Sequence, residues 1–242
     1  MDEASELFED CESESEKCEK IGEYCLAKGD YSGAAAWYRK SEELERGAAT
    51  AFALQLQRII LGGCAVDTEP QRHESVEYCR QLSDAGNPVA QETMAYCYLF
   101  GDMAERDEAT AYTLAWQAEE TGEDAFGLRL APFVLGNCYE QGKGAEADPK
   151  KALSFYLKAA ERGYQPAYYR VGRCYAMGSG TEIDESKAFR AFYRAAETGM
   201  PEAMAEVARR YENGIGVAAD QARGRKWYRR AAKAGVEHKQ TK

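Results

Sequence analysis

Four aspartates recur at the same place in a repeated pattern, and carboxylates of this kind could bind a metal ion or act in acid–base chemistry. They are Asp107, Asp148, Asp184 and Asp220, each fifteen residues before a glycine. The alternative is helix capping, because an aspartate carboxylate accepts hydrogen bonds from the exposed amides of a helix's first turn. Identical placement in four segments favours capping, since every helix of a repeat must begin at such a position.

Eight cysteines and two histidines raise the possibility of a zinc site, a disulfide framework or a nucleophile activated by a base. No CxxC pair exists, and His73 and His238 lie far from any paired cysteine, so we expect no metal site and no catalytic residue. Cys97, Cys138 and Cys174 each stand directly before a repeated tyrosine. Equivalent helices of neighbouring repeats lie about 8–10 Å apart or more, too far for a disulfide. We expect reduced, partly buried thiols.

The glycine-containing loops and the charge distribution exclude further classes of function. Neither "GKGAEADPK" nor "GSGTEIDESK" matches the phosphate-binding pattern G-x-x-x-x-G-K-S/T. The formal charge is −10; residues 1–20 carry net −7 and residues 221–242 carry net +7, so the body of the chain is acidic. Binding to a phosphate backbone needs clustered bases, which argues against nucleic acid as the main partner. We expect no enzymatic activity and no cofactor.

Neither the first ten residues nor the most apolar stretch of the sequence has the features of a secretory signal or a membrane-spanning segment. "MDEASELFED" has no basic head and no apolar core, so we expect no secretory signal. The stretch "AFALQLQRIILGGCAV" is too short and too polar to span a bilayer. The expectation is a cytoplasmic protein without a membrane partner.

Regularly spaced glycines divide the chain into repeats. The glycines are Gly47, Gly86, Gly122, Gly163, Gly199 and Gly235, with spacings of 39, 36, 41, 36 and 36 residues. A fixed period of this size predicts stacked supersecondary units, and glycine is preferred where a helix ends in a left-handed turn. The predicted units are 19–47, 48–86, 87–122, 123–163, 164–199 and 200–235, within one repeat domain over 19–236. Residues 1–18 are predicted to be an acidic lead-in or an added helix, and 237–242 a basic tail.

Each of the three units from 123 onward contains two helical patterns, and "MAYCYLFG" in the unit 87–122 repeats the first of them. The first reads "LGNCYEQGKG", "VGRCYAMGSG" or "VARRYENGIG", with a small residue, a tyrosine three positions later and a glycine after three more. The second reads "ALSFYLKAA", "AFRAFYRAA" or "RKWYRRAA". Residues three apart share a helical face. We predict that the small residue lets the second helix approach, and that the ring of the repeat tyrosine fills the space beside it.

These residues carry a resemblance to a known family. The pattern A…LGxxYxxGxG…D…KAxxWYxKAAxxG from Asn87 to Gly235 resembles the Sel-one-like repeat, a relative of the tetratricopeptide repeat. The first unit resembles a tetratricopeptide repeat proper, with Gly22, Gly29, Tyr31, Ala34 and Tyr38 in its positions. The second unit lacks the glycine–tyrosine signature and is a helical hairpin only by analogy. The resemblance implies an all-α fold, a right-handed superhelical solenoid of about six stacked helix–turn–helix repeats.

The resemblance also implies a function, that of an adaptor or scaffold binding a peptide or partner protein on the concave face of the solenoid. By analogy the first helix of each unit lines that face, which gives as partner-binding candidates Tyr96, Phe133, Asn137, Tyr169, Arg173, Arg209 and Glu212. Two of these candidates could bind a carboxylate or an acidic peptide, namely Arg173 and Arg209, which are flanked by Tyr169. The variable residue types at these positions are typical of a groove and equally of unconstrained surface.

The opposite charges of the two ends leave an alternative open. The acidic N-terminal end of one molecule could dock on the basic C-terminal end of another, which would make this a self-associating structural protein and a homo-oligomer. Solvated helical faces on a highly charged surface would show the same composition.

Overall fold

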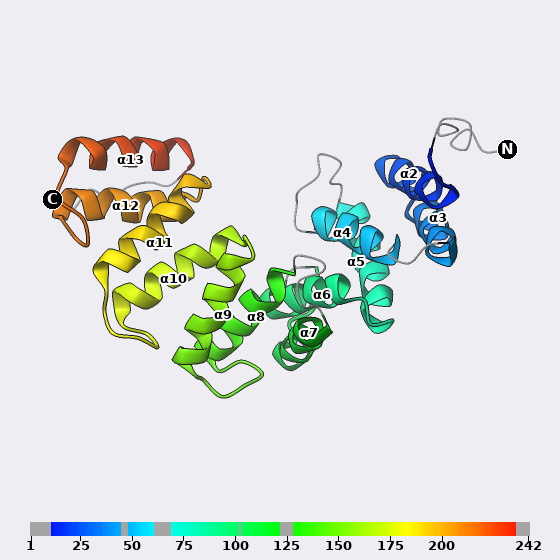
Figure 1. Ribbon diagram of the computed structural model, residues 1–242, viewed down its shortest axis with the longest axis horizontal. Helices are drawn as coiled ribbons and strands as arrows, with labels where there is room; N and C mark the ends of the chain where they lie inside the picture. Colours follow the sequence, from blue (N-terminus) through cyan, green and yellow to red (C-terminus); the bar gives the residue numbers. More distant parts are fainter. Residues whose placement is uncertain (1–10, 45–47, 61–68, 102, 122–127, 236–242) are drawn as a thin grey trace. The chain divides into compact units, whose positions relative to one another are not determined.

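The computed structural model is all-helical over the residues that it describes, which are 11–44, 48–60, 69–101, 103–121 and 128–235 (Figure 1). It consists of two compact units, Met1–Leu128 and Arg129–Lys242. The boundary falls inside the predicted repeat 123–163. Two of the closing glycines, Gly47 and Gly122, lie outside the described residues.

The described part of the first unit contains three successive helix pairs around a shared core. The helices are α2 (Glu14–Ala27), α3 (Tyr31–Leu44), α4 (Ala48–Ile60), α5 (Glu69–Asp84), α6 (Pro88–Phe100) and α7 (Glu108–Thr121). The pair α4–α5, predicted by analogy alone, is helical and contributes Phe52, Leu56 and Val76 to the core. These side chains pack in one cluster with Ile21 of α2 and Met94 of α6. Apolar burial therefore joins all three pairs even where the repeat signature is missing.

The first helix begins earlier than the predicted boundary at residue 19. The Ser13 hydroxyl accepts a hydrogen bond from the Glu16 amide at 3.1 Å and caps α2. Ser15 and Cys18 are buried, so residues 14–18 form part of the first hairpin and not a separate lead-in. A serine at the N-cap position is a local sequence signal for the start of a helix, and the spacing of the repeats does not contain it. The first ten residues of the predicted lead-in lie outside the described part of the chain.

The second unit is a regular series of three helical hairpins. Its helices are α8 (Leu130–Gln141), α9 (Pro149–Glu161), α10 (Gln165–Met177), α11 (Glu185–Glu197), α12 (Pro201–Asn213) and α13 (Gln221–Lys233). Each helix packs against the next one along the chain (Figure 1). Pro132 lies in the first turn of α8, where its missing N–H costs no intrahelical hydrogen bond.

The four recurring aspartates cap the second helix of their hairpins, which confirms the capping interpretation. The Asp148 and Asp220 carboxylates each accept two amide hydrogen bonds at 2.9–3.1 Å. The Asp107 and Asp184 carboxylates each accept one, from the amides three residues on. The backbone amide of each aspartate also donates a hydrogen bond to the carbonyl of the preceding repeat tyrosine, at 2.8–3.1 Å. The pairs are Asp107–Tyr98 in the first unit and Asp148–Tyr139, Asp184–Tyr175 and Asp220–Tyr211 in the second. One residue thus begins the second helix and ties it to the end of the first.

The small residue of the first helix is covered by an aromatic ring, but the ring belongs to the second helix. A Cβ added at Gly136 would lie 2.6 Å from the Tyr156 ring, and one at Gly172 would lie 2.8 Å from the Phe192 ring. The ring that lies directly over the small residue is therefore not that of the repeat tyrosine. Tyr139 instead stacks on Phe155, with ring centroids 5.7 Å apart. A residue three positions along the same helix points beside the glycine, whereas the facing helix approaches it directly.

Two further glycines join successive hairpins. Gly180 follows α10 with φ +74°, and a Cβ there would collide with the Pro149 carbonyl oxygen at the start of α9. Gly216 follows α12 with φ +70° and meets the Glu185 carbonyl at the start of α11 in the same way. Each loop thus lies directly on the first turn of the preceding hairpin's second helix, an approach that leaves no room for a side chain.

We predict unequal costs for alanine at two left-handed glycines. Gly163→Ala should lower the free energy of unfolding by about 1 kcal/mol, because its φ of +84° is strained for alanine but nothing lies within 4 Å of the new Cβ. Gly180→Ala should cost about 3 kcal/mol or more, because the collision with the Pro149 carbonyl adds to the same strain. Urea denaturation followed by circular dichroism measures both. Equal costs would show that the loop does not hold the hairpins together.

The cap at Asp184 predicts a pH dependence. Its hydrogen bond from the Lys187 amide lowers the pKa of the carboxyl group below the ordinary value of 3.8. The charged cap therefore stabilises the fold above that pH, and its contribution is lost as the pH falls through the lowered pKa. Asp184→Ala should melt earlier than wild type at neutral pH, with the difference shrinking below pH 3.8. Asp184→Asn, which caps without titrating, is the control; a difference that is constant with pH would contradict the assignment.

Candidate protein-binding surface

Two of the predicted partner-binding residues, Phe133 and Asn137, are buried in the second unit. Phe133 is 6% exposed, and its ring packs on Tyr156 and Tyr164 with centroids 5.8 and 4.8 Å away. Asn137 is fully buried, and its Nδ2 donates to the Phe133 carbonyl at 2.8 Å. Neither side chain faces solvent, so we leave both out of the surface proposed below.

Tyr169 and Arg173 lie together on α10 and remain accessible. The Tyr169 ring meets Phe192 edge to face at 5.4 Å, which fixes its orientation. Burial raises the pKa of the Tyr169 hydroxyl; the nearby Glu206 raises this pKa further, and Arg173 opposes that effect. Among the described residues the Arg173 guanidinium makes no ion pair. α10 thus presents the half-buried Tyr169 ring, whose orientation is fixed, beside the Arg173 guanidinium, which forms no ion pair with a described residue.

On α12, the predicted Arg209 is already paired. Its Nη2 lies 2.8 Å from the Glu206 Oε2, and this hydrogen bond raises the pKa of the guanidinium. Glu206 also lies close enough to Tyr169 of α10 for its charge to raise the pKa of the tyrosine hydroxyl. We define the first-helix surface as Tyr169, Arg173, Glu206 and Arg209.

Glu212, the last predicted residue of α12, has a role in the packing of its hairpin. The Tyr228 hydroxyl of α13 donates to the Glu212 Oε2 at 3.0 Å. Burial, followed by this hydrogen bond, raises the pKa of Tyr228 to about 12. Glu140 and Tyr156, at the equivalent positions of the α8–α9 hairpin, form the same bond at 2.6 Å. The middle hairpin has Ala176 and Phe192 there, so neither polar partner is present.

Glu140 extends its hairpin bond to the next hairpin. The Arg170 Nη1 of α10 lies 3.4 Å from the Glu140 Oε2, with both side chains one quarter exposed. A single carboxylate therefore binds the second helix of its own hairpin and the first helix of the following one. Sequence analysis missed this role, although the sixteen-residue spacing of Glu140 and Tyr156, repeated at Glu212 and Tyr228, was a signal for it.

Arg210 is a second residue that sequence analysis missed. It is 1% exposed and occupies the position of Cys138 and Cys174, directly before the repeat tyrosine. Its guanidinium lies over the Phe192 ring at 4.9 Å and forms an ion pair with Glu185 of α11. The cation–π contact and the ion pair compensate its burial. Arg210 therefore fills, between α11 and α12, a position that a cysteine occupies in the other two hairpins of this unit.

The remaining candidate, Tyr96, belongs to the first unit. Its half-buried ring lies 4.6 Å from that of Phe100 on the same helix, α6. One turn earlier, Glu92 is 2% exposed and accepts a hydrogen bond from the Gln57 Nε2 of α4 at 2.9 Å. α6 therefore presents mainly Tyr96 at this position, because the neighbouring carboxylate is used in the core.

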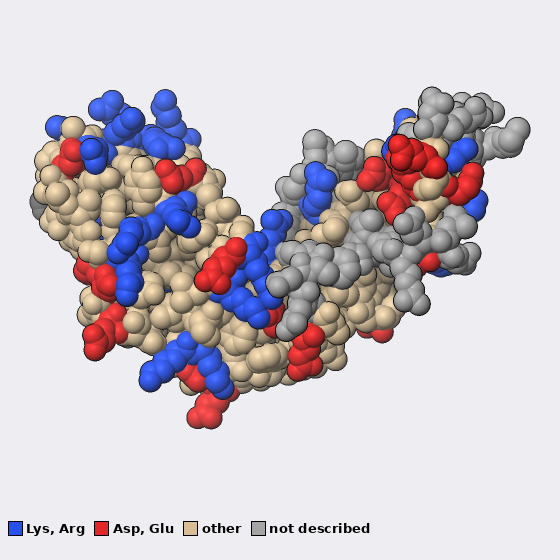
Figure 2. Space-filling view, in the orientation of Figure 1, with Lys and Arg blue, Asp and Glu red and all other residues tan. Residues whose placement is uncertain are grey.

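The described parts of the two charged ends, residues 11–20 and 221–235, lie mostly on the helices α2 and α13. Acidic side chains gather over α2 and α3, and basic side chains over α13 (Figure 2). On α13 the exposed bases are Arg223, Arg225, Lys226, Arg229, Arg230 and Lys233, whereas Trp227 and Ala231 are buried. α13 thus has one buried face and one charged, solvent-exposed face.

The candidate chemistry of the cysteines and acids is largely accounted for by packing. The seven cysteines within the described ranges are thiols, and burial raises the pKa of Cys174 to about 11. Cys64 and His238 lie outside the described residues, and the side chain of His73 is not described. No group of three or more His, Cys, Asp or Glu among the described side chains is placed to hold a metal ion. None of the described helices combines the length and apolarity needed to cross a bilayer.

Comparison with curated proteins finds relatives that are much longer than the matched segment. A 104-residue segment is 34% identical to DAP3-binding cell death enhancer 1 of Mus musculus, covering 43% of this chain and 19% of that protein. An 88-residue segment is 36% identical to chitin synthase regulator SKT5 of Saccharomyces cerevisiae, covering 36% of this chain and 12% of that protein.

Comparison with solved structures supports the fold. A protective antigen of uropathogenic Escherichia coli with an SLR fold superposes with a TM-score of 0.69 and 24% identity, over 98% of this chain and 50% of that one. A Sel1 repeat protein of Oxalobacter formigenes superposes with a TM-score of 0.67 and 23% identity, over 90% of this chain and 83% of that one. At these identities the likeness establishes the all-α repeat fold alone.

The model of the Sel1 repeat matches five segments of the sequence, residues 18–45, 88–115, 131–164, 165–200 and 201–236. They cover most of the first hairpin, most of the α6–α7 pair and almost all of the three hairpins of the second unit. They omit the α4–α5 pair, which lacks the glycine–tyrosine signature. With most of its length covered by these matches and with the hairpin geometry described above, the chain belongs to the Sel1 repeat family.

Proposed function

We propose that this chain is a protein-interaction adaptor that binds an extended acidic peptide of a partner through the first-helix surface of its second unit. Sel1 repeats generally mediate protein–protein interaction, and the name of the mouse relative describes that protein as one that binds another. Solenoids of helical hairpins offer an extended concave face lined by their first helices. The surface Tyr169, Arg173, Glu206 and Arg209 lies on two such helices.

The observation that carries the proposal is the uncompensated guanidinium of Arg173 beside the anchored ring of Tyr169. A partner carboxylate can form two parallel hydrogen bonds with such a guanidinium, which fixes direction as well as adding energy. The apolar part of the same peptide can lie on the ring, whose orientation is already set by Phe192. A preorganised ring loses little conformational entropy on binding.

The arrangement suits binding better than catalysis. The four aspartates that recur in the sequence are occupied as helix caps, and Glu140 and Glu212 accept hydrogen bonds from tyrosines of the second helices. The acids that sequence spacing offered for acid–base chemistry thus have structural partners. Absence of enzymatic activity and a cytoplasmic location remain predictions.

Self-association through the charged ends is the second candidate. The exposed bases of α13 and the acids of α2 favour it by charge complementarity alone. A solvated, charged helix face accounts for the same bases without a partner. Sedimentation velocity in low and high salt separates the two, because a head-to-tail assembly of charged ends must dissociate as salt rises.

The adaptor proposal predicts the effect of one charge reversal. Arg173→Glu should abolish capture of partner proteins from a native lysate, because a carboxylate at this position repels the acidic segment. Lys150→Glu, an equal change of charge at an exposed position of α9, should leave capture unchanged. Quantitative mass spectrometry of proteins retained by wild type and both variants is the measurement. If Arg173→Glu, still folded by circular dichroism, retains the same proteins as wild type, the first-helix surface is not the binding site.

A further inference from the structure

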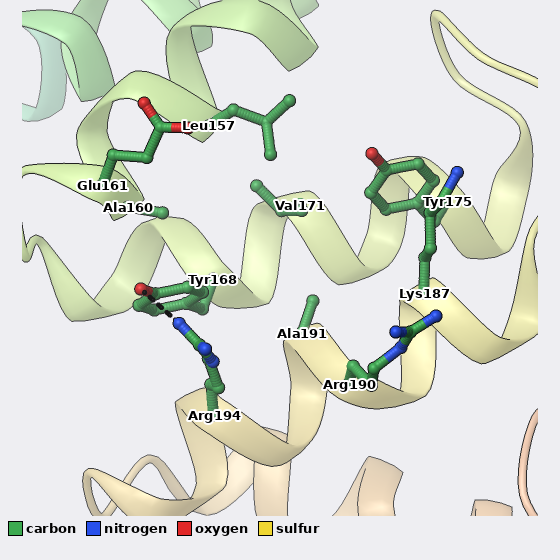
Figure 3. Close-up of a pocket in the computed structure, with 10 residues that line it drawn as sticks. All are labelled: Leu157, Ala160, Glu161, Tyr168, Val171, Tyr175, Lys187, Arg190, Ala191 and Arg194. Carbon is green, nitrogen blue, oxygen red and sulfur yellow. Dashed lines mark hydrogen bonds between the residues drawn. The ribbon is translucent and has the colours of Figure 1, made fainter.

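The second unit contains a groove on another side of α10 from the first-helix surface. It lies between the second helices α9 and α11, with α10 beneath, and has a volume of about 300 Å³ (Figure 3). α10 contributes Tyr168, Val171 and Tyr175 to the groove. These residues lie on a face of the helix turned away from Tyr169 and Arg173, since successive residues advance by about 100°. The groove is therefore a separate surface.

The floor of the groove is apolar. Leu157 of α9, Val171 of α10 and Ala191 of α11 lie along it, and the half-buried rings of Tyr168 and Tyr175 stand on either side of Val171 (Figure 3). A volume of this size is at the lower end of sites that hold a ligand, and it is enough for a few apolar side chains of a docked segment.

One wall of the groove is basic. Lys187, Arg190 and Arg194 follow one another along α11 at intervals of three and four residues, so they share a face of that helix. All three side chains are exposed. Glu161 on α9 is the one acid among the lining residues. The groove therefore carries a net positive charge on a chain whose formal charge is −10.

The bases are held beside the groove while keeping hydrogen-bonding capacity. The Arg194 guanidinium lies over the Tyr168 ring at 5.5 Å and donates to its hydroxyl at 3.2 Å. Arg190 makes one long bond, from Nε to the Ser186 carbonyl at 3.4 Å, and neither arginine forms an ion pair with a described residue. Lys187 lies over the Tyr175 ring and is paired with the Asp184 cap at 3.3 Å. The two arginines are thus the positions at which a partner carboxylate can bind.

We propose that this groove binds an acidic amphipathic helix of a partner protein. Its apolar side chains, spaced at three and four residues, would contact Leu157, Val171 and Ala191, and its carboxylates would pair with Arg190 and Arg194. The charge complementarity of the basic wall selects an acidic segment, and the apolar floor selects one that carries a hydrophobic stripe. A phosphate backbone would use the bases and leave the floor uncovered.

Fluorescence anisotropy with the purified full chain tests the proposal. The probe is a fluorescein-labelled synthetic peptide of about four helical turns, with leucine at every third or fourth position and glutamate or alanine elsewhere. Two control peptides replace all leucines by serine or all glutamates by lysine. The variant Arg190→Glu/Arg194→Glu removes the basic wall. Arg225→Glu/Arg229→Glu, on exposed positions of α13 with the same spacing and the same change of charge, is the matched control.

The expected result is saturable binding of the acidic amphipathic peptide, at least about tenfold weaker for both control peptides and for Arg190→Glu/Arg194→Glu. Arg225→Glu/Arg229→Glu should bind as wild type does, and Arg173→Glu should too, which separates this groove from the proposed adaptor surface. Four results would overturn the proposal: no saturable binding, equal loss in both double variants, equal binding of the serine peptide, or tighter binding of labelled oligothymidylate. A dimer of wild type that Arg190→Glu/Arg194→Glu abolishes would make a second copy the occupant and would equally contradict it.

Discussion

The close contact between a small residue on one helix and an aromatic ring on the next is the constraint on which the hairpins α2–α3, α8–α9 and α10–α11 depend. Tyr156 and Phe192 approach Gly136 and Gly172 so closely that no Cβ fits, and Tyr38 covers Gly22 in the first hairpin in the same way. The contact sets the distance between the two helices of a hairpin. The aspartate caps and the glycine loops then have fixed places to fill, because the helix ends are already aligned.

Polar side chains are arranged around this contact and make each hairpin different. Glu140 accepts a hydrogen bond from Tyr156, which covers Gly136, and Glu212 accepts one from Tyr228 at the equivalent position. Phe192 has no hydroxyl and packs against the Arg210 guanidinium. The same ring position is thus completed in two ways, by a hydrogen bond to a carboxylate or by a cation–π contact with a buried arginine. Arg173, Arg190 and Arg194 form no ion pair with a described residue, and both proposed binding surfaces are built around them.

Much of the fold follows from the sequence because its signals are local. The capping aspartates, the proline starts and the left-handed glycines at 86, 163, 199 and 235 each act within one or two helical turns, so their spacing reveals them. The ring that covers the small residue was not predicted, because spacing along one helix does not show which side chain of another helix faces it. Arg210 was missed for a related reason. An arginine is expected at the surface unless it is known that an aromatic ring and a carboxylate of the preceding helix surround it.

The candidate site was predictable only in part. Tyr169 and Arg173 are accessible where repeat analogy placed them, but Phe133 and Asn137, at the equivalent positions of α8, are buried. Equivalent positions differ because exposure depends on the surroundings of each helix, which a repeat pattern does not contain. The groove between α9 and α11 was not predicted at all, because its lining comes from three helices and its basic wall resembles an ordinary solvated face in the sequence.

The most direct test compares thermal unfolding of Gly172→Ala and Arg173→Glu, two neighbours on α10 to which the account gives opposite roles. In an ordinary helix, alanine in place of glycine stabilises by roughly 1 kcal/mol. The account predicts that Gly172→Ala instead lowers the melting temperature, because the new Cβ meets the Phe192 ring at 2.8 Å, and that Arg173→Glu leaves it unchanged. A higher melting temperature for Gly172→Ala would mean that the close contact does not hold the hairpin together, and would contradict the account.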